Sequence, residues 1–399
     1  MVVQENILYS LRNLEKRRSR SFLTIISIFI GIATIFIFVS FGLGLYDYVN
    51  SFTTSGALDK IVVQAKGSGA PGTSPFKLTN EDLDTVRKTA GVFETEGMYF
   101  KVATINHDNK KIYTYLIGMD PKSTLFTDIS NIEITKGRNL KKGDSGKVVL
   151  GFNYMQPNKI FENPLSVNDK IEINNEKYEI IGFYEEVGNP QDDSQTYITN
   201  EQFENLFPGT SYAMIVAQVD LKTIEQVVDR VEKELRKERN QEEGKEDFFV
   251  STFEDQIAAF TGALDVVVGF IVLIALISVI VSAVNTANTM VTSVIERTRE
   301  IGVLKSIGAK NASIFSIFLF ESSFLGFAAG IVGILVGFII TFIAGRILAS
   351  LGWSFLAPHY SPALFIGCTA FATIVGAVSG VAPAIAAAQK NPVEALRYE

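Results

Sequence analysis

"SFLTIISIFIGIATIFIFVSFGLGL", residues 21–45, contains no charged residue. Three further runs share this property, at Val266–Met290, Ser322–Gly345 and Ser361–Gln389. About 20 apolar residues in a helix cross a hydrocarbon core of about 30 Å, so each run is long enough to span a membrane. A buried core helix is the alternative for any single run, but four such lengths in a chain of 399 residues favour four transmembrane helices.

The first run also differs from a cleaved signal peptide. Its apolar stretch is much longer than the core of a signal peptide, which has about 7–15 residues. No small-residue cleavage site of the A-x-A type follows it. We therefore expect this run to be retained as a membrane anchor.

The charges that flank the runs predict the orientation of the chain. In the long 46–262 loop, Asp and Glu outnumber Lys and Arg, whereas residues 11–20 and the 291–312 loop are rich in Lys and Arg. Short cytoplasmic loops are enriched in these basic residues. We therefore expect a multi-pass protein of the cell membrane, with both termini and the 291–312 loop in the cytoplasm and the large domain outside.

The 46–262 loop has the composition of an ordinary soluble domain. Its two ends, 46–119 and 206–262, alternate strand and helix patterns, and the helix at 221–240 lies between two strands. Its middle, 120–205, has short alternating runs separated by Gly, Asn and Pro, which is typical of β structure. The fold class we predict is a four-helix membrane protein with a large extracellular α/β domain that contains an inserted β-rich subdomain.

Groups that could carry catalysis or bind a metal are few. Cys368 is the only cysteine, and His107 and His359 are the only histidines, so a His-rich metal site is excluded. Walker A, H-E-x-x-H and G-x-S-x-G motifs are absent. Solvated turns explain the neighbouring carboxylates Glu185–Glu186 and Asp192–Asp193 better than a catalytic dyad does. We expect a chain that is not an enzyme, has no catalytic, cofactor or metal residues, and has no nucleic-acid partner.

Small residues form a stripe along the third run. The stripe has the helical spacing i, i+4, i+7 and i+11 and consists of Gly326, Gly330, Gly333 and Gly337. Small residues let helix backbones approach closely in lipid, where association depends on packing contact. Two interpretations are open: packing inside the chain, or an interface with a second copy.

Glu321 is an ionisable residue at the start of the third run. Such a group is costly in a membrane unless it is paired or reaches the headgroups. It either pairs with a basic residue of the preceding loop or extends to the membrane surface.

A charged stretch, "ERTREIGVLKSIGAKNASIF" (296–315), separates the second and third runs. At 100° per residue, Val294, Ile301 and Leu304 share one side of a helix that Gly308 ends. Arg297 and Lys305 flank this side, where they can extend to the membrane surface. We expect a short helix along the inner membrane face that presents both signs of charge to the cytoplasm. Mixed charge favours a protein partner over lipid alone.

Several stretches occur in the same order as in a known family. They are "ERTREIGVLKSIGAKNASIF", followed by "ESSFLGFAAGIVGILVG", the N-terminal "SLRNLEKRRSRSFLTIISIFIGI", "KGRNLKKGDSGKVVLG" with "YEIIGFYEE" in the outer loop, and the C-terminal "PAIAAAQKNPVEALRYE". Through them the chain resembles the permeases of the FtsX-like family of ABC transporters, the MacB and lipoprotein-releasing group. The resemblance covers nearly the whole chain.

The resemblance implies a permease that forms a homodimer and couples ATP hydrolysis to movement of its outer domain, a mechanism called mechanotransmission. Export or extrusion of a lipid, lipoprotein, peptide or drug would follow. The coupling helix would contact a separate ATPase subunit through Glu296, Arg297, Arg299, Glu300, Lys305 and Gly308. In MacB the ATPase is fused ahead of the permease, whereas only 20 residues precede the first run here. We therefore expect ATP and Mg to be bound by another chain and no cofactor in this one.

Pattern and resemblance together predict the order of segments. We expect an N-terminal interfacial helix and the first span in 1–45, the outer domain in 46–119 and 206–262 with the insert 120–205, spans at 263–290, 313–348 and 361–388, the coupling helix in 291–312, and a cytoplasmic tail at 389–399. A membrane-anchored receptor and a division-type regulator of an extracellular hydrolase are the alternatives. A receptor has no need of a charged helix between its second and third spans.

Overall fold

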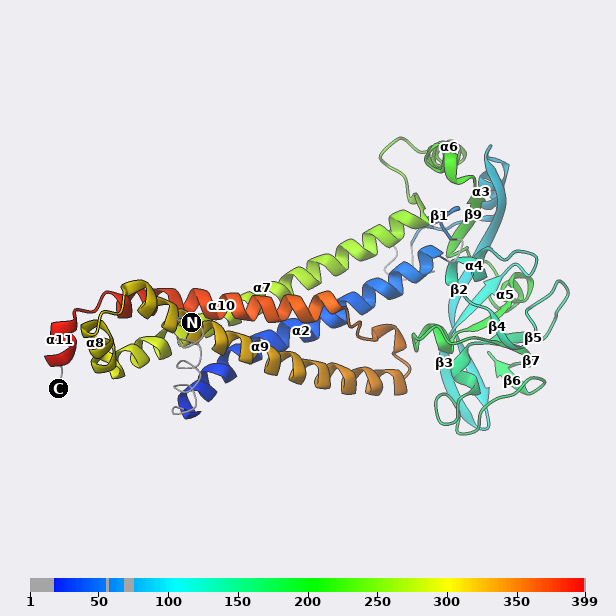
Figure 1. Ribbon diagram of the computed structural model, residues 1–399. Coiled ribbons are helices and arrows are strands. Elements are labelled where there is room, and N and C mark those ends of the chain that lie inside the picture. The colour runs from blue at the N-terminus through cyan, green and yellow to red at the C-terminus, as the bar shows by residue number, and fades with distance from the viewer. Residues whose placement is uncertain (1–17, 55–56, 68–74, 398–399) are drawn as a thin grey trace. The chain divides into compact units, whose positions relative to one another are not determined.

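The computed structural model describes residues 18–54, 57–67 and 75–397 (Figure 1). The chain forms two compact units. The membrane unit consists of 1–45, 263–347 and 356–399, and the outer unit consists of 46–262 and 348–355. The N-terminal interfacial helix that we predicted before the first span lies outside the described residues.

The membrane unit is built from four long helices. They are α2 (Arg18–Thr54), α7 (Phe253–Glu296), α9 (Asn311–Ser350) and α10 (Pro362–Ala388). Each is long and apolar enough to cross a membrane, so the prediction of four transmembrane helices is confirmed. Two short helices, α8 (Thr298–Ser306) and α11 (Pro392–Arg397), lie side by side near the C-terminal end of the chain (Figure 1).

The glycine stripe of α9 is filled by helices of the same chain. A Cβ on Gly330 would lie 2.8 Å from the Cβ of Ala372 on α10, and a Cβ on Gly333 would lie 2.9 Å from a backbone oxygen of α2. Gly326 likewise faces α10, and Gly337 faces α2. Of the two open interpretations of the stripe, the structure bears out packing inside the chain, because the close approaches are made to α10 and α2 of the same chain.

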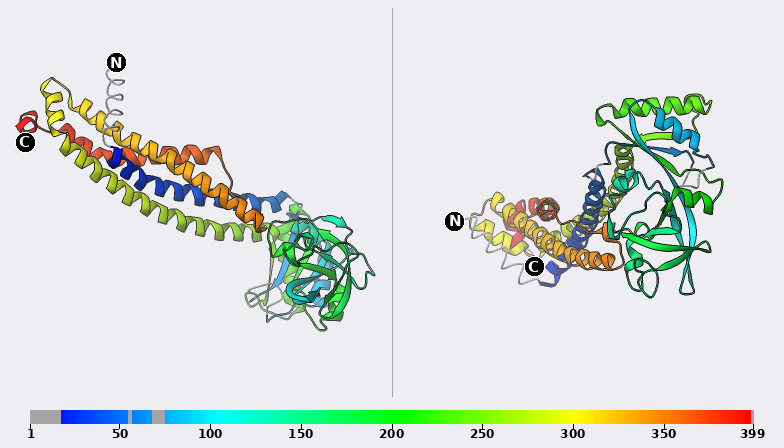
Figure 2. Two further views of the ribbon diagram at one scale, coloured as in Figure 1. Left: turned by 90° about the horizontal axis from the view of Figure 1, so that it is seen from below. Right: turned by 90° about the vertical axis from the view of Figure 1, so that its right-hand side faces the viewer.

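The first part of the outer unit is a sheet covered by two helices. Its strands are β1 (Lys60–Ala65), β9 (Met214–Val219), β10 (Phe248–Thr252) and the first half of β2 (Val92–His107), and its helices are α3 (Asn80–Lys88) and α6 (Ile224–Glu238). Both β9 and β10 pair antiparallel with β1, so the predicted β-α-β unit is split by a strand from earlier in the chain. Leu83, Val86, Val227, Val231 and Leu235 pack the two helices against one face of the sheet (Figure 2).

The second part of the outer unit is a closed ring of six strands. In ring order they are β2, β3 (Lys110–Met119), β8 (Thr196–Thr199), β5 (Lys147–Leu150), β7 (Glu176–Tyr184) and β6 (Lys170–Ile173), which pairs again with β2. Strand β4 (Ile134–Gly137) pairs with β7. The β-rich character predicted for 120–205 matches this ring. The ring also takes in β3 and the second half of β2, because the hairpin that they form extends from one sheet into the other.

Short helices complete the outer unit. The short helices are α4 (Leu125–Ser130), α5 (Asn200–Leu206) and the 3-10 helices Phe152–Met155, Asp192–Ser194, Leu221–Thr223 and Ser354–Leu356.

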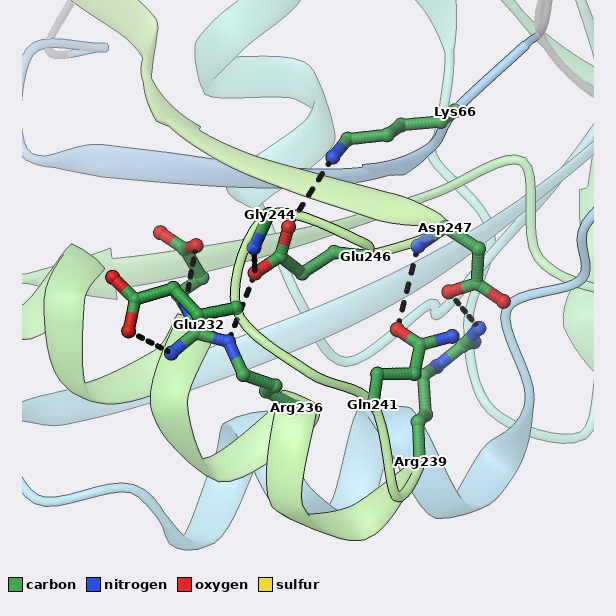
Figure 3. Close-up of polar contacts among 9 residues, drawn as sticks. Lys66, Glu232, Arg236, Arg239, Gln241, Gly244, Glu246 and Asp247 are labelled. Carbon is green, nitrogen blue, oxygen red and sulfur yellow. Dashed lines mark hydrogen bonds and ion pairs between the residues drawn. The ribbon is translucent and has the colours of Figure 1, made fainter.

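The end of α6 is joined to its neighbours by arginines (Figure 3). Arg236 donates to Glu246 at 2.9 Å, and Arg239 binds Asp247 at 2.7 Å and Asp82 of α3 at 2.6 Å. These contacts hold α3, α6 and the residues before β10 together.

Candidate functional site: the charged helix between the second and third spans

The charged stretch folds as the short helix α8, directly after α7. The buried side is the predicted one, with Val294 and Ile301 buried and Leu304 packed against the same cluster. Glu296, Arg299 and Ser306 are exposed, as predicted. The amphipathic pattern therefore locates α8 correctly.

Arg297, the residue between α7 and α8, is almost completely buried. Only 5% of its surface is exposed, and its guanidinium donates to Glu300 and to Glu321, each at 3.0 Å. It also lies 5.1 Å from the ring centre of Phe318. Because Glu321 is itself 6% exposed, the two charges form a buried pair that joins the start of α8 to α9. Of the two interpretations of Glu321, the structure bears out pairing with a basic residue of the preceding loop.

Lys305 joins α8 to α10. Its ammonium group donates to the backbone oxygens of Ala388 at 2.6 Å and Lys390 at 2.7 Å. The last carbonyl groups of a helix lack partners inside the helix and carry partial negative charge, so a lysine there satisfies them and complements the helix dipole. This corrects the expectation that Lys305 flanks the helix and extends to the membrane surface, because its charge is used at the end of α10.

Gly302 and Gly308 have different roles in the same helix. A Cβ on Gly302 would lie 2.9 Å from the Cβ of Ala395, so this glycine allows α11 to pack directly on α8. Gly308 has φ +96 with nothing within 4 Å, which is the left-handed conformation that ends α8 before α9 begins. Sequence reasoning found Gly308 but missed both Gly302 and α11. The available signal was a glycine on the buried side of an amphipathic helix.

The solvent-exposed side of α8 and α11 combines charged residues with exposed apolar residues. Glu300 is exposed and lies next to exposed Arg299. Val303 is 47% exposed and Ile307 is 78% exposed, and on α11 Val393 is 64% exposed and Leu396 is 45% exposed. An exposed apolar group beside both signs of charge is typical of a surface that meets another protein.

Glu96 and Asp193 are two of the buried carboxylates of the outer unit, and their burial was not predicted from the sequence. Glu96 is 1% exposed and accepts the backbone N–H groups of Asp120 and Phe126, both at 3.1 Å. Burial raises the pKa of Glu96 to about 7. Asp193 is 2% exposed and accepts two backbone N–H groups, so the expectation of a solvated turn at this residue is wrong. Both carboxylates fix loops, and the described residues contain no cluster of three or more His, Cys, Asp or Glu that could hold a metal.

Four long apolar helices, a short charged helix fixed to three neighbouring helices and a sheet-rich outer unit define a multi-pass membrane protein with a large domain outside its spans. Comparison with protein families specifies the kind. Residues 21–234 match the MacB-like periplasmic core domain, and residues 272–392 match the FtsX-like permease C-terminal domain. The chain belongs to the MacB/FtsX-type family of ABC transporter permeases.

Individual relatives agree with the family. The chain is 30% identical over 401 residues to an uncharacterized ABC transporter permease of Methanocaldococcus jannaschii, covering 100% of this chain and 99% of the relative. It is 25% identical to the macrolide export ATP-binding/permease protein MacB of Neisseria gonorrhoeae, covering 96% of this chain and 59% of the relative. A crystal structure of the extracellular domain of the transporter YknZ from Gram-positive bacteria matches with 16% identity and a TM-score of 0.39, covering 48% of this chain and 99% of that chain.

The two family matches and the Methanocaldococcus jannaschii relative confirm the resemblance that the sequence motifs indicated. The chain is a membrane protein with a periplasmic or extracellular domain and a permease domain. The cytoplasmic placement of the two termini remains a prediction from the Lys and Arg asymmetry.

Proposed function

We propose that this chain is the permease subunit of an ABC transporter whose ATP and Mg are bound by a separate ATPase chain. The 399 residues contain no Walker A motif. The MacB relative is named an ATP-binding/permease protein, and this chain matches only 59% of its length. The ATP-binding part of the MacB relative therefore lies outside the part that matches this chain.

The attachment of α8 to three other helices is the observation that carries the proposal. Arg297 binds Glu321 on α9, Lys305 binds the end of α10, and Gly302 packs against α11. A force applied to the solvent-exposed side of α8 is thereby passed to α9 and α10 and is not absorbed by a flexible loop. Transmission of this kind is what coupling to an ATPase requires.

The six residues predicted to couple to the ATPase divide into three groups. Glu296, Arg299 and Glu300 are exposed and supply the contact surface. Arg297 and Lys305 hold α8 in place, and Gly308 makes the turn into α9. A protein that pushes on this helix would therefore contact the exposed charges. The side chains of Arg297 and Lys305 would keep α8 attached to its neighbours.

We also propose that two copies pair in the membrane, through a face other than the glycine stripe. Helix α7 is the span least covered by its own chain. In its most apolar stretch 17% of the residues are buried, against 33% for the corresponding stretches of α9 and α10 and 44% for that of α2. Its exposed apolar residues form a continuous face that a second copy can cover. Outward movement of a lipid, lipoprotein, peptide or drug would follow from motion of the two outer units.

The test exchanges two exposed charges of the charged stretch without changing the net charge. Arg299→Glu combined with Glu296→Lys should leave the protein folded and inserted, because both side chains are exposed and the bonds of Arg297 and Lys305 are kept. The complex of the permease with its ATP-binding chain is purified from membranes, and ATP hydrolysis is measured with and without the permease. We expect the variant to bind the ATPase at least about tenfold more weakly, about 1.4 kcal/mol, because repulsion replaces attraction at the contact.

A matched exchange in the outer unit controls for general effects of charge. Lys245 and Glu242 form an exposed ion pair, with side chains 74% and 77% exposed. Lys245→Glu with Glu242→Lys should behave as the unaltered protein. Normal binding and normal regulation of ATP hydrolysis in the variant of the charged stretch would show that this stretch is not the ATPase contact.

A further inference from the structure

Part of the connection between α9 and α10 belongs to the outer unit. Residues 348–355, which are the end of α9 and the first residues after it, cluster with 46–262, whereas Leu356 and the rest of the connection cluster with the membrane helices. The backbone N–H of Trp353 donates to the oxygen of Leu348 at 2.8 Å, and Gly352 has φ +88, so the loop closes on itself as a compact turn. We call residues 348–355 the strap.

The strap is attached to one loop of the strand ring, residues 186–194, which we call the seat. The backbone N–H of Phe355 donates to the oxygen of Gly188 at 3.1 Å, and the Ser354 hydroxyl donates to Glu186 at 3.2 Å. Lys159, from elsewhere in the ring subdomain, donates to the oxygen of Ser350 at 3.4 Å. Three polar contacts at different points of an eight-residue segment fix both its position and its direction.

Aromatic rings add an apolar contact to the strap. The ring of Phe355 lies 5.6 Å from that of Trp353 and 5.5 Å from that of Tyr48, measured between ring centres. Tyr48 belongs to the part of α2 that lies in the outer unit. The strap therefore contacts both the strand ring and the helix by which the chain enters the outer unit.

The seat is held in shape by its own hydrogen bonds. The buried carboxylate of Asp193 accepts the N–H groups of Val187 at 2.7 Å and Gly188 at 3.0 Å. Gly188 has φ +86, and a Cβ there would lie 2.8 Å from the hydroxyl oxygen of Ser354 and 3.2 Å from its Cβ. Only glycine combines this backbone conformation with room for the strap.

We propose that the strap is a second mechanical connection between the membrane helices and the outer unit, in addition to the chain connections through α2 and α7. A domain inserted between two spans needs only the two chain connections at its own ends. Here the α9–α10 loop is bound to the strand ring as well, so movement at the outer ends of α9 and α10 is passed to that ring. The use of this movement in transport rests on the proposed function, whereas the attachment itself does not.

The first experiment detects the attachment alone, in the full chain in lipid nanodiscs and without an ATPase. Trp353 is the only tryptophan of the protein and lies in the strap, so tryptophan fluorescence reports on the strap directly. Gly188→Val should release the strap, shift the emission slightly to longer wavelength and raise quenching by acrylamide by up to about twofold, because the Trp353 ring is 44% exposed in the folded protein and becomes fully exposed when the strap leaves the seat. Gly209→Val is the control, because Gly209 has φ +74 with nothing within 4 Å and bears the same backbone strain without a neighbour.

A second variant tests the attachment by a covalent bond. Gly188→Cys with Ser354→Cys, in a Cys368→Ser background, places two thiols at positions whose Cβ atoms would lie 3.2 Å apart. This separation is close to the range of about 3.5–4.5 Å found in disulfides, so mild oxidation should join them. Unchanged fluorescence in Gly188→Val, or failure of the two cysteines to join, would overturn the attachment.

The mechanical role is tested by the permease's effect on ATP hydrolysis in the complex with its ATPase. We expect Gly188→Val and the reduced double-cysteine variant to bind the ATPase but lose this regulation, and oxidation to restore it. Normal regulation in Gly188→Val with altered fluorescence would refute the mechanical role and leave the proposed function intact. Absence of any ATPase binding by the unaltered protein would refute the proposed function, while the fluorescence result for the strap would still hold.

Discussion

Replacement of Arg297 by methionine is the sharpest test of how α8 is held. The change removes the guanidinium that lies 3.0 Å from Glu321 and 3.0 Å from Glu300, and it keeps most of the apolar length of the side chain. Glu321 is 6% exposed and would remain in place with its charge no longer balanced by Arg297. The expected effect is therefore dominated by the carboxylate that remains, not by the lost volume.

The size of the effect follows from the burial of the pair. Removing one partner of a buried ion pair costs about 3–5 kcal/mol, whereas an exposed pair is worth only about 0–1 kcal/mol. Arg297 is 5% exposed, so the buried figure applies to its bond with Glu321. For a unit of this size, 1 kcal/mol corresponds to about 2–4 °C in melting temperature. We expect Arg297→Met to lower the melting temperature of the membrane unit by about 6–20 °C.

Heating in detergent followed by gel filtration measures the fraction of protein that remains folded. Arg299→Met, two residues along the chain, is the matched control, because Arg299 is exposed and its loss should cost less than about 0.5 kcal/mol. Arg297→Met combined with Glu321→Met should recover most of the loss, since the buried carboxylate that faced Arg297 is removed as well. If Arg297→Met melts within about 2 °C of the unaltered protein, less than about 1 kcal/mol, the pair does not hold α8.

Two further substitutions test the packing of the spans and the buried carboxylate of the outer unit. Gly326→Leu should cost about 1–3 kcal/mol and lower the melting temperature by about 2–12 °C, because α10 occupies the space that a side chain would need. Glu96→Gln should remove one source of pH dependence: burial raises the pKa of Glu96 to about 7, above the unfolded value of about 4.3. The penalty for its charge is absent below about pH 4, grows as pH rises and is complete above about pH 7, with an upper limit of about 4 kcal/mol.

A control variant checks the prediction for Gly326→Leu, and a pH series checks the prediction for Glu96→Gln. Gly269 on α7 has nothing within 4 Å, so Gly269→Leu should melt as the unaltered protein does, and equal melting of Gly326→Leu would mean that α9 and α10 do not pack as described. For Glu96, melting of the outer unit is followed from pH 4.5 to 7.5. The difference between the unaltered protein and Glu96→Gln should change steadily in favour of the variant as pH rises. A constant difference would show that Glu96 does not titrate in this range.

The fold could be predicted from the sequence wherever a pattern is local and strong. Charge-free runs of more than 20 residues fixed the four spans, and helical periodicity located α6 and the buried side of α8. The order of motifs also pointed to the correct family. These features depend on residues close in the chain, so the sequence reports them directly.

The tertiary structure decided what each functional residue touches. The glycine stripe and the charges of α8 were visible as patterns, but a pattern does not say whether the neighbour is another copy, another helix or solvent. Gly330 meets Ala372, Lys305 meets the end of α10, and Asp193 is buried against the backbone of Val187 and Gly188. Such contacts join residues far apart in the chain, and their energies depend on burial and distance, which are properties of the folded molecule. For the same reason, only the structure could assign residues 348–355 to the outer unit.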